Sequence, residues 1–274
     1  MSYTPSLPMH RTDAAVALEA LVATSLAPID PDPATETALR ARLFARVARS
    51  ARANAPFVNV RKGDGQWLEA SPGVCCKQLY EAHGVVSRLV RLDSAARWCL
   101  SQTAGADELL VLSGHLHIDD LELGPGDYRL RGNDAGTVNA LSPSGALVYW
   151  RHSGTPQTAF GSVHTSITVP ASADGWEALR PGVTLKPLFG AGERVSMLAR
   201  LDKGGSVPAH AHACAEECLM LEGDMFLGDV LLLEGEYQWA PAGSNHELLH
   251  SDAGCVLFIH GTVDPALKDA AYTG

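Results

Sequence analysis

The sequence predicts a mainly β protein in which a short helical segment precedes two similar β barrels. The chain repeats itself without a gap after a shift of 109 residues, which places SPGVCCKQLYEA (71–82) on RPGVTLKPLFGA (180–191) and ADELLVLSG (106–114) on AEECLMLEG (215–223). Each copy consists of short β-rich runs separated by Gly and Pro turns, as in small barrels. We therefore expect a helical segment at 1–55, a first barrel at 56–155 and a second barrel at 156–274.

The first 55 residues predict helices rather than strands. A helix over 12–26 has one apolar face, and the three prolines of 27–33 end it. A second helix is expected from about Pro33 to about Asn54. We expect its apolar stripe to pack on the barrels; the alternative is that this basic helix docks onto an acidic partner. The stripe and the basic residues are Leu39, Leu43 and Val47, and Arg40, Arg42, Arg46, Arg49 and Arg52.

The composition excludes several classes of protein. The chain is 46% hydrophobic and 19% charged, which is typical of a soluble globular protein. Its net charge of −10 argues against nucleic acid as a partner, because phosphate binding needs a basic surface. We expect no membrane span, because no apolar run reaches about 18 residues, and no signal peptide. The six cysteines are expected to be free thiols, and the protein is expected to be cytoplasmic.

Four potential metal ligands lie close together in the second copy: His210, His212, Glu216 and His246. Alternate residues of a strand share a face, so His210 and His212 are expected to point the same way. Imidazole nitrogens with one carboxylate suit a divalent cation such as zinc, iron or manganese. The sequence therefore predicts a metal site in the second barrel.

The repeat predicts one metal per chain. The equivalent positions of the first copy are Ser101, Thr103, Asp107 and Thr137, so no imidazole is present there. His115 and His117 share a face of a predicted strand, but they align with positions that are not ligands in the second copy. A structural or pocket-lining role is favoured for them over a second metal site. The first barrel is thus expected to be degenerate and metal-free.

Strand alternation also predicts what surrounds the metal. If Glu216 and His246 point inward, residues two and four positions further along point inward as well, and Glu217 points outward. The expected neighbours of the metal are Cys218, Met220, His250 and Cys214. Inert packing is favoured for the two thiols; a thiol that oxidises or enters the coordination sphere is the alternative.

These residues resemble the two motifs of the cupin superfamily, one from Gly204 to Gly223 and one from Gly235 to His246. The resemblance implies antiparallel jelly-roll barrels with the metal inside, and the repeat makes the chain a bicupin. Two further stretches, 39–67 and PAHAHACAEECLMLEGD (208–224), resemble the ChrR-like anti-sigma factors and the cupins grouped with them.

The ChrR-like resemblance implies a regulator. In that family an N-terminal helical domain binds an extracytoplasmic-function sigma factor, and the metal-bearing cupin behind it receives a signal. The family's sigma-binding domain has its own zinc motif, a His followed by Cys-x-x-Cys, whereas residues 1–55 hold His10 and no cysteine. The implied partners are a sigma factor or other protein at the helices, a small-molecule signal and a second copy of the chain as a homodimer.

The same cupin group includes non-haem Fe(II)-dependent dioxygenases that cleave small diketones and aromatic ketones. Two classes of function therefore stay open, and the sequence does not decide whether the protein is an enzyme. We favour the regulator with zinc, which would sense an oxidant or a small molecule through the second barrel. The dioxygenase would instead hold iron with free coordination positions. No phosphate-binding loop or serine-hydrolase elbow is present.

Overall fold

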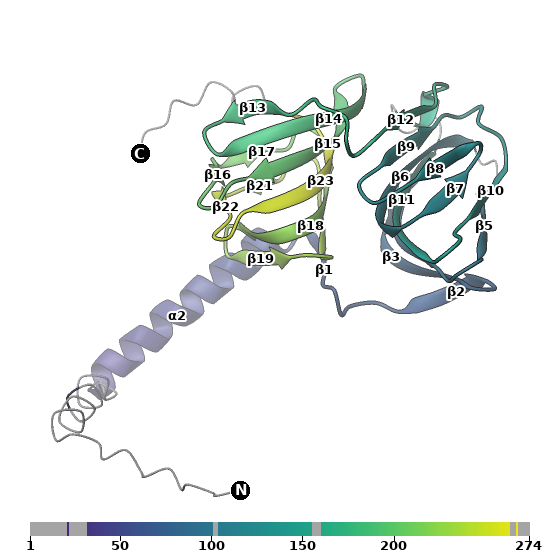
Figure 1. The fold of residues 1–274 in the computed structure, drawn as a ribbon. Helices are drawn as coiled ribbons and strands as arrows, with labels where there is room; N and C mark the ends of the chain where they lie inside the picture. The colour runs from purple at the N-terminus through teal and green to yellow at the C-terminus, as the bar shows by residue number, and fades with distance from the viewer. Residues whose placement is uncertain (1–20, 22–31, 101–103, 155–159, 264–266, 268–274) are drawn as a thin grey trace, which may run out of the picture. The chain divides into compact units, whose positions relative to one another are not determined.

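Within the described residues the protein is mainly β with one long helix, as predicted (Figure 1). The computed structural model describes residues 21, 32–100, 104–154, 160–263 and 267. The predicted helix at 12–26 lies outside these residues, except for Leu21. The chain forms two compact units, Met1–Arg52 and Ala53–Gly274.

Helix α2 spans Pro33–Asn54, which matches the predicted bounds. Asp32 caps it, because its Oδ1 accepts hydrogen bonds from the backbone N–H groups of Ala34 (3.0 Å) and Thr35 (3.1 Å). No residue of α2 is buried, and the packing of its apolar stripe on the barrels stays a prediction. The exposed stripe residues are Leu39, Leu43 and Val47. No helix in this described part of the chain is long and apolar enough to cross a membrane.

Two large antiparallel sheets correspond strand by strand under the 109-residue shift. The strands of the first are β2 (Trp67–Ser71), β3 (Val74–Ala82), β4 (Val85–Leu92), β6 (Gly105–Gly114), β9 (Tyr128–Arg131), β11 (Ala146–Gly154) and β12 (Ile167–Val169). Those of the second are β13 (Glu177–Arg180), β14 (Val183–Ala191), β15 (Arg194–Leu201), β18 (Glu216–Leu227), β20 (Tyr237–Ala240), β23 (Cys255–Gly261) and β1 (Val58–Val60). Their orders are β12-β9-β6-β11-β4-β3-β2 and β1-β20-β18-β23-β15-β14-β13.

Each repeat also has short strands besides these seven, which form a separate four-stranded sheet in the first repeat and join the large sheet through β18 in the second. In the first repeat the order is β5-β10-β7-β8, with bounds Arg97–Leu100, Val138–Leu141, Leu116–Ile118 and Leu121–Leu123. In the second repeat β16 pairs with β22, β22 with the end of β18, and β18 with β19. The bounds of β16, β22 and β19 are Ser206–Val207, Leu249–His250 and Val230–Leu233. A short pair, β17 (His210–Ala211) with β21 (Asn245–His246), completes this half.

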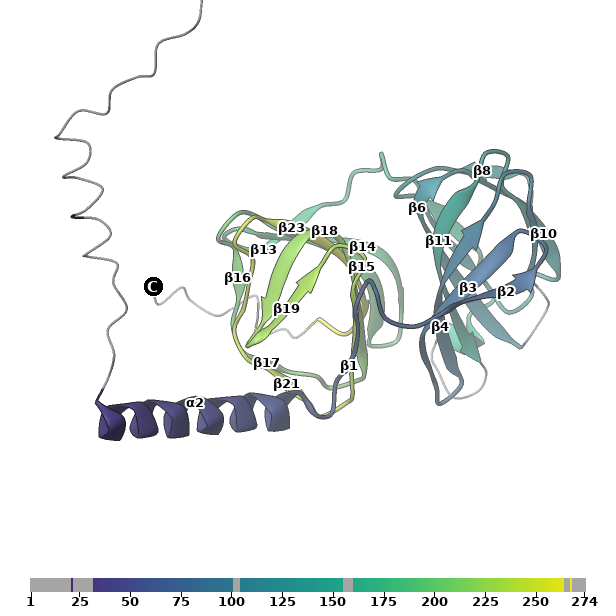
Figure 2. The ribbon, with the colours of Figure 1, turned by 90° about the horizontal axis from the view of Figure 1, so that it is seen from below.

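The two repeats exchange their first strands. β1, at the start of the first repeat, pairs with β20 of the second, and β12, at the start of the second, pairs with β9 of the first. In Figures 1 and 2 the purple-blue β1 accordingly lies at the green and yellow strands. The predicted domain boundary between 155 and 156 stays a prediction, because residues 155–159 lie outside the described part. Because of the exchange, dividing the chain at this boundary would separate β1 and β12 from the sheets that they join.

The hydrophobic core has three parts. One lies between the large and small sheets of the first repeat and one in the same place in the second. The third joins the two repeats, with Tyr149 and Leu110 from one and Phe258 and Leu219 from the other. The outer faces of the two large sheets therefore bury each other, which explains why both carry apolar side chains.

Buried charges cross this contact between the repeats. Arg151 of β11 donates through Nε to Glu217 (2.7 Å) and through Nη1 to Glu108 (3.1 Å). Ser87 donates to Glu217, and its repeat partner Ser196 donates to Glu108. Tyr237 and Tyr128, which are also repeat partners, donate to the same two carboxylates at 2.7 Å. Glu217 thus points out of its own sheet, as predicted, but it is buried because the other repeat covers it.

The network keeps both carboxylates charged. Burial by itself would raise the pKa of Glu108, but its interactions with His260, Arg151 and Ser196 outweigh burial and lower that pKa to about 2. The pKa of Glu217 is lowered as well, because Arg151 and His260 outweigh its burial. Arg151 is therefore the cation on which two buried anions depend.

We expect Arg151→Met to lower the free energy of unfolding by about 3–5 kcal/mol, because it leaves Glu108 and Glu217 buried without their cation. Urea denaturation followed by circular dichroism measures this change. Lys62→Ala is the control, since its pair with Glu234 is 3.9 Å long and exposed, and should change stability by less than about 1 kcal/mol. Equal stability of the two variants would contradict the role given to Arg151.

Candidate metal centre

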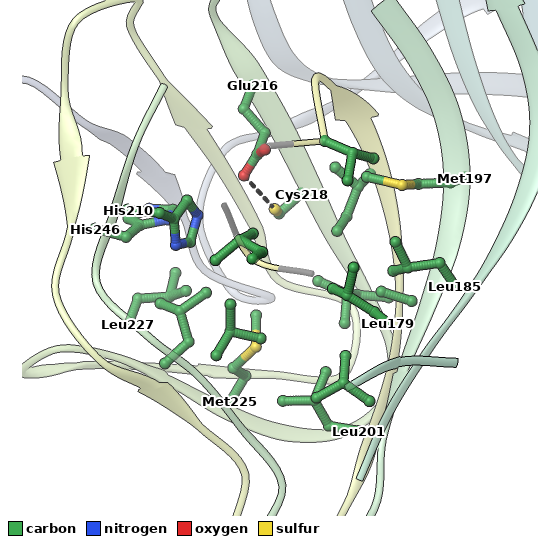
Figure 3. Close-up of a pocket in the computed structure, with 18 of the residues that line it drawn as sticks. Leu179, Leu185, Met197, Leu201, His210, Glu216, Cys218, Met225, Leu227 and His246 are labelled. Carbon is green, nitrogen blue, oxygen red and sulfur yellow. Dashed lines mark hydrogen bonds between the residues drawn. The ribbon is translucent and has the colours of Figure 1, made fainter. Parts of the chain in front are cut away.

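The four predicted ligands come together in the second repeat. His210 in β17 pairs with His246 in β21, His212 follows β17, and Glu216 begins β18. One donor atom from each residue lies within 4.8 Å of the others, and all but His210 are buried. Figure 3 shows His210, His246 and Glu216 facing the same cavity.

In His210 and His212, hydrogen bonds place the ring proton on Nδ1. His210 Nδ1 donates to the carbonyl oxygen of Pro208 (2.9 Å), which can only accept. His212 Nδ1 lies 2.9 Å from Ser244 Oγ, whose own proton is donated to the carbonyl oxygen of Pro241. Ser244 therefore accepts from His212, and the Nε2 atom of each ring keeps its lone pair.

His246 is oriented by residues of the exchanged strand. Its Nε2 donates to Gln238 Oε1 (2.9 Å), and Gln238 Nε2 donates to Asn59 Oδ1 in β1 (2.8 Å). Phe57, just before β1, stacks on the imidazole with a centroid distance of 5.2 Å. Sequence reasoning missed these three residues, because no local signal relates the start of the first repeat to the last ligand.

The inner nitrogens lack partners, which is the observation that fits a metal. His212 Nε2 and His246 Nδ1 are buried without a hydrogen bond. Burial, with the neighbouring imidazoles, lowers the pKa of His212 to about 4 and that of His246 to about 3. Both rings are therefore neutral near pH 7 and offer lone pairs to a cation, whereas a buried polar atom left without a partner costs about 1–3 kcal/mol.

Glu216 supplies the carboxylate of the site. Its Oε1 lies 3.5 Å from His212 Nε2 and accepts a hydrogen bond from Cys218 Sγ (3.6 Å). Burial raises the pKa of Glu216 to about 7, although the hydrogen bond from Cys218 opposes this. A divalent cation would stabilise the charged form. Gly261 leaves room for the side chain, since a Cβ there would lie 2.9 Å from Glu216 Cγ.

An apolar cavity of about 60 Å³ adjoins the ligands (Figure 3). His210, Glu216 and His246 line one part of it, and aliphatic side chains line most of the rest. Cys218 lines it too, as predicted. Burial and the charge of Glu216 raise the pKa of Cys218 well above its usual value, so the sulfur stays a thiol, which supports the packing role.

The other predicted neighbours do not line this cavity. Met220 is buried in the core, and Cys214 is half-buried in the turn before β18. His250 stacks on Phe226 at 4.7 Å and is half-exposed. The alternation from His246 to His250 is not maintained, because β21 and β22 are separate short strands joined by an irregular segment.

The first repeat fills the equivalent place with its own side chains. Asp107, the counterpart of Glu216, lies 3.4 Å from Arg131 Nη1 and 2.9 Å from His152 Nδ1. Trp98 and Trp150 pack there in a T-shaped pair at 5.9 Å, where the second repeat has the smaller Val207 and Ile259. Arg131 thus forms an ion pair with Asp107, and indole rings occupy the interior. The positions equivalent to His210 and His212, 101 and 103, lie outside the described residues. His115 and His117, for which a structural or pocket-lining role was expected, are exposed.

Comparison with known proteins gives a family match for the C-terminal part of the chain. Residues 164–263 match the family model of the ChrR Cupin-like domain, which agrees with the resemblance seen in that part of the sequence. A search of curated protein sequences gave no significant match.

Several solved structures share the fold over most of the chain. A candidate dioxygenase from Nostoc punctiforme is 13% identical, with a TM-score of 0.59 over 79% of this chain and 85% of that chain. The bacterial pirin YhhW from Escherichia coli, in complex with nickel(II), is 10% identical, with a TM-score of 0.57 over 75% and 98%. Oxalate decarboxylase from Lactobacillus farciminis, in a formate complex, is 11% identical, with a TM-score of 0.58 over 75% and 86%. At these identities the similarity establishes the cupin fold alone.

We expect Gln238→Ala to weaken zinc binding by about 10- to 100-fold, because it removes the acceptor that orients His246. Competition with a chromophoric chelator measures the affinity. Gln78→Ala, which changes an exposed glutamine of β3, is the control and should leave affinity unchanged. An unchanged affinity in Gln238→Ala would contradict the role given to Gln238 in orienting His246.

Proposed function

We propose that the protein is a metal-dependent regulator of the ChrR type, in which a zinc ion at the four ligands reports a signal to a partner of the N-terminal helix. The observation that supports this most is the contact of Phe57 and Asn59 with the surroundings of His246. These residues follow α2 within a few positions of its end at Asn54. A change at the metal would therefore act first on the chain segment that leads out of α2.

The donor set favours zinc. Three imidazoles and one carboxylate would hold a zinc ion with four protein ligands, and a closed shell of protein ligands is typical of a structural or sensing site. The ion, when bound, supplies the positive charge that offsets Glu216 and holds β17, β18 and β21 together. Cys218 remains a thiol, so loss of the ion or occupation of the adjoining cavity is a better signal than thiolate oxidation.

The proposed partner is a sigma factor that binds α2. The helix exposes Leu39, Leu43 and Val47 and carries five arginines, which together suit an acidic protein surface with an apolar strip. The zinc motif of the family's own sigma-binding domain has no counterpart here, so recognition would depend on this face. Such a regulator would act in the cytoplasm, where the six free thiols stay reduced.

We expect the purified protein to contain one equivalent of zinc, and His212→Ala and His246→Ala to lose it. Metal content is measured by inductively coupled plasma mass spectrometry after dialysis. His250→Ala is the matched control, because this imidazole lies on the neighbouring strand outside the ligand set, and it should keep the metal. Two equivalents of metal, or retention by both ligand variants, would contradict a single site.

We expect a sigma factor to co-purify with the full chain from the native cell and to be lost in Leu43→Asp/Val47→Asp. Mass spectrometry identifies the bound protein. Arg40→Glu/Glu36→Arg reverses one exposed ion pair on the same helix and preserves its apolar face, so it serves as the control for helix folding. Recovery of no sigma factor, or equal recovery with the apolar-face variant, would exclude this partner.

The dioxygenase is the second candidate, and the apolar cavity beside the ligands is the observation that favours it. The same four residues would hold an iron ion, which would supply the redox chemistry for a reaction with dioxygen. The cavity would hold the apolar part of a small diketone or aromatic ketone. Iron content together with oxygen consumption on a panel of such ketones would favour the enzyme over the regulator.

A further inference from the structure

A second cavity, of about 120 Å³, lies between the two repeats, apart from the metal ligands. Its lining includes Tyr80 and Trp239, which stack on each other at 4.6 Å, together with Ala82, Val85 and Ala215. An engineered apolar cavity of about 150 Å³ is known to bind benzene, so this volume is on the scale of one aromatic ring.

Comparison of the two repeats shows that an aromatic side chain occupies the site equivalent to this cavity. Phe160 is fully buried at the equivalent position of the other repeat, where its ring packs edge-on against Phe189 (5.3 Å) and His260 (4.6 Å). Under the 109-residue shift Phe189 corresponds to Tyr80 and His260 to Arg151, and both of these line the cavity. The counterpart of Phe160 under the shift is Ala51, whose methyl side chain provides no ring. One slot is thus filled by a phenyl ring from the chain, and its twin is not.

Two buried side chains that line the cavity each have a nitrogen that the charge network does not use. The side chain of Arg151 is only 2% exposed, and its hydrogen bonds to Glu217, Glu108 and Ser153 use Nε and Nη1. Nη2 has no hydrogen-bond partner among the described residues. His260, 1% exposed, likewise uses Nδ1 and leaves Nε2 over. A guanidinium N–H at the wall of a cavity is stabilised by an oxygen acceptor.

The rim adds an unpaired positive charge. Arg194 lines the cavity, and its Nη1 donates to the carbonyl oxygen of Ala215 (3.1 Å). No carboxylate pairs with it within the described chain. Glu217 also lines the cavity, but its charge is matched by Arg151 and by three hydroxyl groups. Arg194 is therefore the positive charge at the rim that a ligand could pair with.

We propose that this cavity binds a small aromatic carboxylate, with its ring in the slot that Phe160 fills in the other repeat and its carboxylate at Arg194 and Arg151. The site is distinct from the metal centre. Glu216 and Glu217 are successive residues of β18, so the metal ligand and the wall of this cavity lie on opposite faces of one strand.

Isothermal titration calorimetry of the full chain with benzoate tests this. We expect one site per chain, with benzyl alcohol (ring without charge) and acetate (charge without ring) each binding at least about 10-fold more weakly. Arg194→Ala should weaken benzoate by about 10- to 100-fold, the range of a charge-assisted hydrogen bond. Arg91→Ala, on the outer side of the first repeat over Trp67, is the matched control and should not change it.

Two further variants separate this site from the others. Val85→Phe places a ring in the slot and should abolish binding while the far-ultraviolet spectrum stays unchanged. His246→Ala removes a metal ligand and should leave benzoate binding intact, which distinguishes the cavity from carboxylate coordination to a metal. Absence of benzoate binding to the wild-type chain, loss of binding in His246→Ala, or equal affinity in the Arg194 and Arg91 variants would overturn the proposal.

Discussion

The exchange of first strands between the two repeats is the constraint on which the rest of the structure depends. β1 completes the sheet of the second repeat and β12 completes that of the first, so neither half has a full sheet by itself. The exchange also brings Phe57 and Asn59 to the candidate metal site, because the strand that follows Phe57 and carries Asn59 is the neighbour of Gln238 in β20. The candidate metal site of one repeat is therefore supported by residues from the start of the other.

The contact between the repeats follows from the same arrangement. Once the outer faces of the large sheets cover each other, carboxylates that would otherwise be solvated become buried, and each needs compensation. Glu108 and Glu217 obtain it from hydroxyl groups at equivalent positions and from the single guanidinium of Arg151. His260, the repeat counterpart of Arg151, contacts only one of them, at 3.2 Å from Glu108. The two repeats therefore differ at this position, because Arg151 pairs with both carboxylates and His260 does not.

The interior side chains of the two repeats differ, and this difference decides which repeat can bind a metal ion. Both copies keep the glycines that let strands approach closely: a Cβ on Gly114 or Gly223 would lie 2.0 Å from a carbonyl oxygen. The interiors differ. The first holds indole rings and the ion pair of Asp107 with Arg131, whereas the second has aliphatic side chains, a cavity and imidazole nitrogens without partners. The two repeats thus share a backbone scaffold, whereas the volume and charge of their interior side chains differ.

The sequence by itself determined the mainly β fold, the repeat, the bounds of α2 and the four potential ligands, because these depend on local periodicity, capping and spacing. Tertiary structure decided the rest. Strand exchange links residues far apart in the chain, so Asn59 and Gln238 could not be recognised as supports for His246. Alternation correctly placed Cys218 but failed for His250, since it holds only while a strand continues. Alternation also predicts that Glu217 points out of its own sheet. The burial of its charge beside Arg151, however, results from the packing of the two repeats.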